Sequence, residues 1–392
     1  MAEKRRKNKK PENIEPKTPG VFGSEMGLWI GIITTVVFVL FGERLFSNLG
    51  NTTLYASSFF CLFIVMLWLS FSVVQHADCL AIKLGEPYGT LILTLSVISI
   101  EVIMIAAVML TGVKSPTLAR DTMFAVLMIV LNGMVGVTLL LGGLRHQEQE
   151  YNLRGANAYL TVIITLSVLG LVLPRFSSST PDASASPLLA VFLVVVTIGL
   201  YAVFLGIQTM RHRGFFMEPL GIEPLHTDSA QNDSRSGEKH PLTRSVGYHS
   251  LLLVASMVPI VLLSKKMAVL IDHGIATIGA PVALGGVVVA LLVLSPEGLG
   301  ALRAALHNRI QRTVNICLGS ALATTALTIP AVLTISLVTG KHIELGLDPQ
   351  ELVILALTLL ICMVNFGSGR TNILQGAVHL IIFVTYVVLL FD

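Results

Sequence analysis

Charged residues are scarce in this chain. Asp, Glu, Lys and Arg make up 12% of its 392 residues, whereas a soluble domain usually carries about 25%. Hydrophobic residues make up 54%, and the mean hydropathy is +0.80. A formal net charge of +3 is also too small for the basic surface of a nucleic-acid-binding protein. We therefore expect an all-α polytopic membrane protein surrounded by lipid, with no nucleic-acid partner.

Cysteine and the common hydrolase motifs are scarce or missing as well. The four cysteines have no metal or redox spacing, so we expect them to be small buried apolar side chains. They are Cys61, Cys79, Cys317 and Cys362. The chain has neither the H-E-x-x-H motif of zinc metalloproteases nor the G-x-S-x-G elbow of serine hydrolases. The sequence thus favours no enzyme class and no permanently bound cofactor.

Long apolar runs fill most of the sequence. A helix needs about 20 mostly apolar residues to cross a bilayer, and the runs with their polar breaks predict about 11 spans. These lie near 26–42, 54–74, 88–111, 121–143, 158–174, 187–208, 249–264, 277–300, 313–338, 350–366 and 371–391. The first run is short and follows a basic stretch. No A-x-A cleavage site follows it, so we expect an uncleaved anchor rather than a signal peptide.

Lysine and arginine accumulate on one predicted side of the membrane. Only seven of the 26 fall in segments that would lie outside, and the other 19 fall in the N-terminal tail and the inner loops. The seven are Arg44, Lys114, Arg120, Arg175, Lys265, Lys266 and Lys341. Because cytoplasmic loops carry an excess of positive residues, we expect the N-terminus inside the cell and the C-terminus outside.

One long polar loop divides the chain. Its stretch H-T-D-S-A-Q-N-D-S-R-S-G-E-K-H-P lacks aromatic residues, which predicts a disordered linker. The predicted organisation is a basic cytoplasmic tail, an extra first helix with an outer loop, a five-helix repeat, a cytoplasmic linker and a second five-helix repeat. The respective ranges are 1–25, 26–53, 54–208, 209–248 and 249–392.

The repeat prediction depends on two acidic residues in apolar runs. Glu101 ends L-S-V-I-S-I-E, and Glu297 ends L-L-V-L-S-P-E; each has Gly twelve residues before it and Ser two residues before it. Each lies in the second span of a five-span block. Because five is odd, the two blocks cross the membrane in opposite senses, as in transporters whose substrate site lies near the midplane. We expect Glu101 and Glu297 to share one site; the alternative is two neutral carboxyls that only join helices.

Two facing carboxylates have a definite chemistry. At an effective dielectric constant near 20, unit charges about 4 Å apart repel by about 4 kcal/mol, so the empty pair should hold protons. A hard cation such as Ca²⁺, which prefers oxygen ligands, would neutralise the pair instead. The hydroxyls of Ser99 and Ser295, and backbone carbonyls near Pro296, Gly298 and Gly300, would add oxygens. Competition between cation and proton in a two-sided scaffold predicts exchange.

Four ordered blocks resemble a known family. They are L-G-E-P-Y-G-T-L-I-L-T-L-S-V-I-S-I-E, L-L-L-G-G-L-R-H-Q-E-Q, L-L-V-L-S-P-E-G-L-G-A-L and G-S-G-R-T-N-I-L-Q-G-A-V-H-L. The chain resembles the bacterial calcium/sodium–proton antiporters of the calcium:cation antiporter superfamily from about residue 54 onward. The resemblance implies a bacterial inner-membrane antiporter of Ca²⁺ for H⁺, with the essential acids at Glu101 and Glu297. Relatives often carry an amide three residues before each acid, where this chain has Ile98 and Leu294; Na⁺ and K⁺ are therefore further candidate ions.

Several other residues in or near the predicted spans have more than one interpretation. Glu86 would recruit cations at the cytoplasmic mouth, begin a helix as an acid favoured by the local dipole, or pair with Lys83. Asn132 would contribute an oxygen to the ion, or join helices by a hydrogen bond. Ser320 occupies a position that is polar in relatives and would line the site. His379 would relay protons or pack in the core, and Arg370 would anchor the topology or take part in gating.

Two other function classes remain open at this stage. A cation channel would need several copies of the chain to form a ring of acids, since Glu101 and Glu297 each occur once per chain. The sequence leaves open whether the protein is a homo-oligomer. An intramembrane enzyme could use the paired glutamates as acid and base in hydrolysis, but nothing in the sequence suggests a sugar-binding surface. Coupled proton flow distinguishes the antiporter from both.

Overall fold

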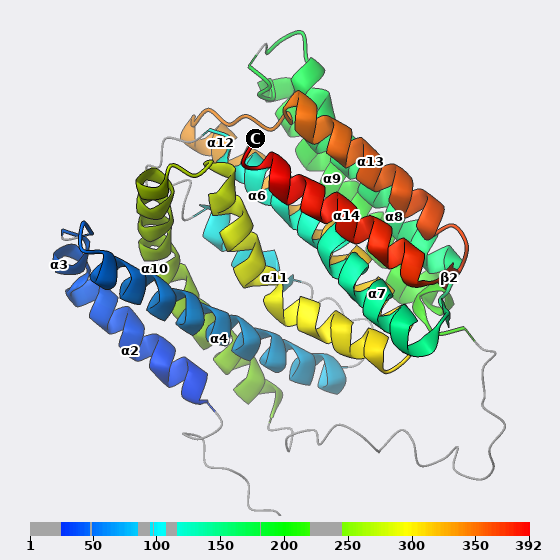
Figure 1. Ribbon diagram of the computed structural model, residues 1–392, viewed down its shortest axis with the longest axis horizontal. Helices are drawn as coiled ribbons and strands as arrows, with labels where there is room; N and C mark the ends of the chain where they lie inside the picture. Colours follow the sequence, from blue (N-terminus) through cyan, green and yellow to red (C-terminus); the bar gives the residue numbers. More distant parts are fainter. Residues whose placement is uncertain are drawn as a thin grey trace, which may run out of the picture.

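The computed structural model is almost entirely helical and describes residues 25–47, 49–84, 95–96, 98–106, 116–180, 182–219 and 245–392 (Figure 1). Its α-helices are α2 (Met26–Leu40), α3 (Gly42–Phe46), α4 (Thr52–Leu84), α6 (Leu118–Met128), α7 (Val135–His146), α8 (Leu153–Ser167), α9 (Pro187–Gly206), α10 (Val246–Ile278), α11 (Ala283–Leu306), α12 (Ile310–Thr339), α13 (Pro349–Asn365) and α14 (Ile373–Leu389). Residues 98–106 are also helical.

Short π- and 3₁₀-helical turns continue several of these helices. The π-turn η1 (Ile129–Met134) joins α6 to α7, so that 118–146 is one rod. The turns η2 (Val168–Val172) and η3 (Leu173–Phe176) extend α8, and η4 (Ile207–Arg211) and η5 (Arg213–Phe216) follow α9. The two short strands β1 (Gln149–Glu150) and β2 (Arg370–Thr371) pair antiparallel. They tie the turn after α7 to the turn before α14.

The multi-span helical prediction is confirmed. Seven helices of the described ranges are long and apolar enough to cross a membrane, and α2, α13 and α14 are shorter apolar helices. Several helices exceed their predicted spans. The run at 54–74 ends before Gln75 and His76, yet α4 continues to Leu84, and His76 is buried within it with a hydrogen bond to Glu25. Of the predicted span 88–111, only 95–96 and 98–106 are described.

The predicted linker range 209–248 begins with the helical turns η4 and η5, in which Phe216 is buried. Aromatic packing of Phe216 on Tyr159 and Phe204 holds this segment against the bundle. The stretch 226–241, which was predicted to be disordered, lies outside the described residues. Cys61 is exposed, whereas the other three cysteines are buried as expected. Residues 1–24 and 220–244 lie outside the described ranges.

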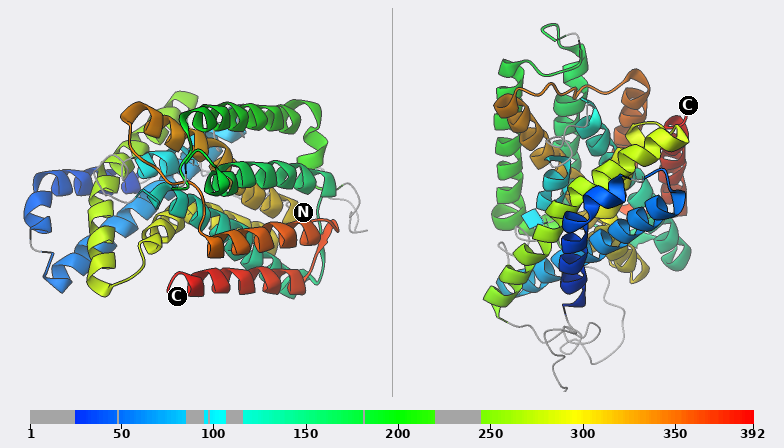
Figure 2. Two further views of the ribbon diagram at one scale, coloured as in Figure 1. Left: turned by 90° about the horizontal axis from the view of Figure 1, so that it is seen from above. Right: turned by 90° about the vertical axis from the view of Figure 1, so that its left-hand side faces the viewer.

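The packing divides the helices into two groups (Figures 1 and 2). In the smaller group α4 packs along α10, and α2 lies against both; the larger group holds α6 to α9 with α12 to α14. The pairs are reciprocal: α12 packs on α9 as α7 packs on α14, and α8 lies beside α9 as α13 lies beside α14. Two structurally related halves that pack against each other in a symmetric way would produce this pattern. α11 contacts both groups and so lies between them.

Candidate functional site

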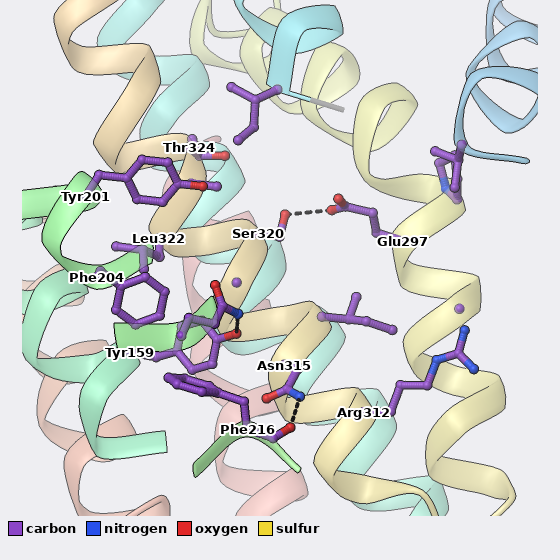
Figure 3. A pocket seen from close by; sticks show the side chains of 18 of the residues that line it. Tyr159, Tyr201, Phe204, Phe216, Glu297, Arg312, Asn315, Ser320, Leu322 and Thr324 are labelled. Carbon is purple, nitrogen blue, oxygen red and sulfur yellow. Dashed lines mark hydrogen bonds between the residues drawn. The ribbon is translucent and has the colours of Figure 1, made fainter. Parts of the chain in front are cut away.

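A cavity of about 460 Å³ lies between the two groups of helices, and both Glu101 and Glu297 line it. Segment 98–106 and α11 contribute the two carboxyls, and α12 runs along the cavity with Ser320 and Thr324 in its wall. The opposite wall is largely aromatic (Figure 3). It is formed by Tyr159, Tyr201, Phe204 and Phe216.

Glu101 is almost fully buried, with 2% of its surface exposed. Its carboxylate accepts a hydrogen bond from Thr324 Oγ1 at 2.8 Å and another from Thr328 Oγ1 at 3.2 Å. The two threonines are four residues apart on α12, and residues at this spacing share one face of a helix. Both hydroxyls therefore reach the same carboxylate from a neighbouring helix.

Glu297 is half-buried and lies directly after Pro296 inside α11. Its carboxylate accepts a hydrogen bond from Ser320 Oγ at 2.6 Å, and Figure 3 shows the side chain reaching from α11 toward α12. Proline has no N–H and interrupts the hydrogen-bond ladder of its helix. α11 is therefore locally loosened beside its acidic residue.

Hydroxyl groups on one face of α12 bond both acidic side chains. Ser320, Thr324 and Thr328 follow one another at intervals of four residues, and a helix rises about 1.5 Å per residue. Their hydroxyls thus form a ladder with steps of about 6 Å. Because Ser320 bonds Glu297 while Thr324 and Thr328 bond Glu101, the two carboxyls lie on successive steps.

The two acids have no basic partner in the described structure. None of the ion pairs among the described residues includes Glu101 or Glu297. Arg213 and Arg312 line the same cavity near its linker end, and Figure 3 shows Arg312 reaching toward α11 below Glu297. The carboxyls are thus free to take up protons or a cation.

The cavity extends toward one face of the molecule. Beyond the acids its lining includes Gln208, Arg213 and Met217 before the linker, Asp78 in the last two turns of α4, and Arg312 in the first turn of α12. These residues lie on the side where the linker leaves the fold. The site is therefore accessible from the linker face.

Only one of the four predicted site-lining residues lies where the sequence placed it. Ser320 bonds Glu297, as described above. Ser99 Oγ donates instead to the backbone oxygen of Leu95 at 2.5 Å, and Ser295 Oγ donates to that of Leu291. Neither serine is among the residues lining the cavity. Glu86, predicted at the mouth, lies outside the described residues.

Asn132 lies in a separate buried cluster. It is in the π-turn η1, where its Nδ2 donates to Thr358 Oγ1 at 2.9 Å and its Oδ1 lies 3.3 Å from His379 Nδ1. This cluster joins η1 to α13 and α14, which is the helix-joining interpretation of Asn132. A π-helical segment interrupts the regular hydrogen-bond pattern of an α-helix, and such segments often occur at functional sites.

Arg370 pairs with acidic residues in the neighbouring strand β1 and directly before it. Its Nη2 lies 2.6 Å from Glu150 Oε1, and its Nη1 lies 3.8 Å from Glu148 Oε2. The side chain is 63% exposed and is not among the residues that line the cavity. The structure thus places Arg370 in the strand pair that fixes the turn before α14.

Sequence reasoning missed the threonines that hold Glu101. The signal was present in the stretch T-T-A-L-T, in which Thr324 and Thr328 share a helix face. It was weak, because threonine in an apolar helix commonly bonds its own backbone. Thr325, within the same stretch, does so with Ala321.

Comparison with known proteins gives a consistent result. The sequence profile of the family described as sodium/calcium exchanger protein matches residues 54–210 and 248–391. The chain is 41% identical over 322 residues to the sodium-potassium/proton antiporter ChaA of Escherichia coli (strain K12), covering 82% of this chain and 85% of that protein. It is also 41% identical to the putative ionic transporter y4hA of Sinorhizobium fredii (strain NBRC 101917 / NGR234), covering 81% and 84%.

Solved structures share the fold at low sequence identity. Native YfkE superposes with a TM-score of 0.69 at 18% identity, covering 93% of this chain and 99% of that one. The H⁺/Ca²⁺ exchanger CAX superposes with a TM-score of 0.62 at 15% identity, covering 93% and 88%. At these identities the likeness establishes the architecture alone.

Proposed function

The chain belongs to the sodium/calcium exchanger family, and from that premise we propose that it is a cation/proton antiporter whose transport site is the pair Glu101 and Glu297. The observation that carries the proposal is the shared cavity. Both acids line it, both are held by hydroxyls of α12, and no ion pair of the described residues neutralises either.

Exchange follows from competition for the same oxygens. Burial disfavours a charged carboxylate unless a proton or a cation neutralises it. Two acids bonded to successive hydroxyls of α12 are neutralised by protons or by a bound cation, and binding of one expels the other. Alternating exposure of this site to the two faces then couples cation movement in one direction to proton movement in the other.

The choice of cation is the finer part of the proposal. The 41% identical relative is named a sodium-potassium/proton antiporter, and a 22% identical protein of Aphanothece halophytica is named a Ca²⁺/H⁺ antiporter. The two carboxylates and the hydroxyls of Ser320, Thr324 and Thr328 are oxygen ligands suited to Ca²⁺. We propose that Ca²⁺ is carried and that Na⁺ and K⁺ compete for the same pair of acids.

Family membership and the distribution of Lys and Arg support a proposed location. We place the protein in the bacterial inner membrane, with the linker and N-terminus in the cytoplasm and the C-terminus outside. The described conformation is then open to the cytoplasm, where it loads a cation for export.

A flux assay in proteoliposomes tests the proposal. An imposed pH gradient should drive uptake of Ca²⁺, Na⁺ or K⁺, with proton flow in the opposite direction. A channel would instead show uncoupled conductance, and an enzyme would show no flux. Cation flux by the wild-type protein without opposite proton flow would contradict the proposal.

Two substitutions test the assignment of the site. Glu101→Gln and Glu297→Gln keep the side-chain shape but cannot cycle protons, so each should abolish exchange in a folded protein. Glu148→Gln removes a charge of the same type from an exposed position on the linker face, where the Glu148 side chain is 61% exposed, and should leave exchange intact. Transport retained by either site variant would show that the pair is misassigned.

A further inference from the structure

A second pair of carboxylates flanks the proposed site. Asp78 on α4 lines the main cavity, and Asp272 on α10 lines a separate small cavity of about 20 Å³. That volume is sufficient for about one water molecule. None of the ion pairs among the described residues includes Asp272. Asp272 is half-buried on a mostly apolar cavity, so its charge is neutralised when it binds a proton or a cation.

The small cavity lies on the face opposite the linker. It is bounded by Leu118 and Thr122 at the start of α6, by Val282 at the start of α11 and by Ile275 near the end of α10. Both α6–α7 and α11 run from that face toward the linker face (Figure 1). The main cavity, by contrast, reaches Arg213 and Arg312 at the linker face.

Little more than one helical turn separates the two cavities. Ile98 and Glu101 line the main cavity, whereas Met104 and Ile105 line the small one. Residues three and four positions apart are neighbours on one helix face, so the small cavity begins about 5–6 Å beyond Glu101. The two cavities therefore approach each other along segment 98–106.

The two aspartates have comparable positions in the chain. Asp78 precedes Glu101 by 23 residues and Asp272 precedes Glu297 by 25, each on the helix before its glutamate. α4 and α10 are both 33 residues long and pack against each other. Asp78 lies toward the linker end of α4, and Asp272 lies toward the opposite end of α10. The two acids thus occupy equivalent places on opposite faces.

We propose that the Asp272 cavity is the closed form of the vestibule on the face opposite the linker, and that Asp272 attracts cations there as Asp78 does at the linker face. The inference rests on the proposed antiport function and assigns one carboxylate to each direction of approach. A carboxylate in a narrow, low-dielectric mouth raises the local concentration of cations. Each aspartate should therefore govern cation affinity from its own side only.

Transport measured from each face separates the two roles. Purified protein is reconstituted, and cation KM is determined with the substrate presented at the linker face or at the opposite face, using Na⁺ and Ca²⁺ as probes. Asp272→Asn should raise KM at the opposite face several-fold and leave KM at the linker face unchanged. Asp78→Asn should show the reverse pattern. Asp272→Glu, which keeps the charge, should behave like the wild type.

Asp182→Asn is the matched control. Asp182 lies in the loop before α9 on the same face as Asp272, with its side chain 47% exposed, and it lines neither cavity. Its loss should change neither KM. An equal effect of Asp182→Asn and Asp272→Asn, or an equal shift at both faces in either cavity variant, would overturn the inference. If the wild type exchanges normally and Asp272→Asn changes neither KM, the inference fails while the antiport function stands; if the wild type does not exchange, the function itself fails.

Discussion

At the scale of single residues, hydroxyl groups decide how the acids are held. Thr324 and Thr328 are 1% and 0% exposed and bond Glu101 from α12, whereas Ser99, two residues from Glu101, bonds its own backbone. A hydrogen bond to a charged group contributes about 1.5–3 kcal/mol. The threonines therefore stabilise the ionised carboxylate that a cation requires.

Removing one of these hydroxyls should weaken cation binding. Thr324→Val keeps the shape of the side chain but leaves Glu101 with one hydrogen bond fewer, and about 1.4 kcal/mol corresponds to a tenfold change in affinity. We expect KM for the cation to rise roughly tenfold, measured by flux in proteoliposomes. Thr324→Ser restores the hydroxyl and should recover most of the affinity. Thr325→Val, which removes a hydroxyl bonded within α12, should have little effect on KM.

Proton competition is a second consequence at this scale. Because the cation and the protons neutralise the same carboxyls, lowering the pH on the side where the cation is offered should raise its KM. The maximal rate at saturating cation should change less. A KM independent of pH, measured across a series of buffers, would argue against a shared site.

At the scale of helices, close approach of backbones holds the larger group together. Gly376 on α14 faces α7, and a Cβ there would collide with the backbone of Leu140; a Cβ at Gly136 would lie 2.9 Å from the backbone nitrogen of Leu380. The two glycines therefore allow α7 and α14 to pack at short range, beside the buried cluster of Asn132 and His379. In a membrane such small residues supply much of the helix association.

A larger residue at this contact should loosen the bundle. Gly376→Val forces α14 away from α7, and overpacking of this kind costs about 1–3 kcal/mol. We expect a lower Tm for the detergent-solubilised protein, followed by thermal denaturation with size-exclusion chromatography. Gly199→Val is the control, since a Cβ at Gly199 on α9 meets nothing within 4 Å. A similar loss of Tm in both variants would indicate a general effect of valine rather than the α7–α14 contact.

At the scale of the whole molecule, a buried ionic network holds the face opposite the linker together. Arg120 at the start of α6 pairs with Asp121 at 2.8 Å and with Asp348 before α13 at 3.2 Å, and it donates to the backbone oxygen of Gly346 at 3.1 Å. Arg120 and Asp121 are 6% and 4% exposed. The network connects the two halves of the chain on the side where the main cavity is closed.

Breaking this network should be strongly destabilising. Arg120→Gln leaves the buried Asp121 carboxylate without its partner, and removal of one member of a buried pair costs about 3–5 kcal/mol. We expect a marked fall in Tm. Arg175→Gln removes a 37% exposed side chain that pairs with Asp348 at 3.6 Å, and exposed pairs contribute about 0–1 kcal/mol. Equal Tm values for the two variants would contradict a structural role for Arg120.

Much of this protein can be predicted from its sequence. The scarcity of charge and the lengths of the apolar runs determined a multi-span helical protein, because a bilayer excludes unpaired charges and unsatisfied backbone groups. The isolated Glu101 and Glu297 stood out for the same reason, and their matching Gly and Ser offsets suggested a common site. Helix lengths were predicted less well, since residues such as His76 are polar in sequence yet buried by partners on other helices.

Only the tertiary structure decided which side chains surround the acids and which face they are open to. A hydroxyl in an apolar helix has two choices, its own backbone four residues back or a group on a neighbouring helix. The local sequence is similar in both cases. Ser99 and Ser295 donate to their own backbone. Ser320, Thr324 and Thr328 donate to a carboxylate on a neighbouring helix. The rotation of each helix about its own axis selects between them, and that rotation is set by packing over the whole bundle rather than by any short stretch of residues.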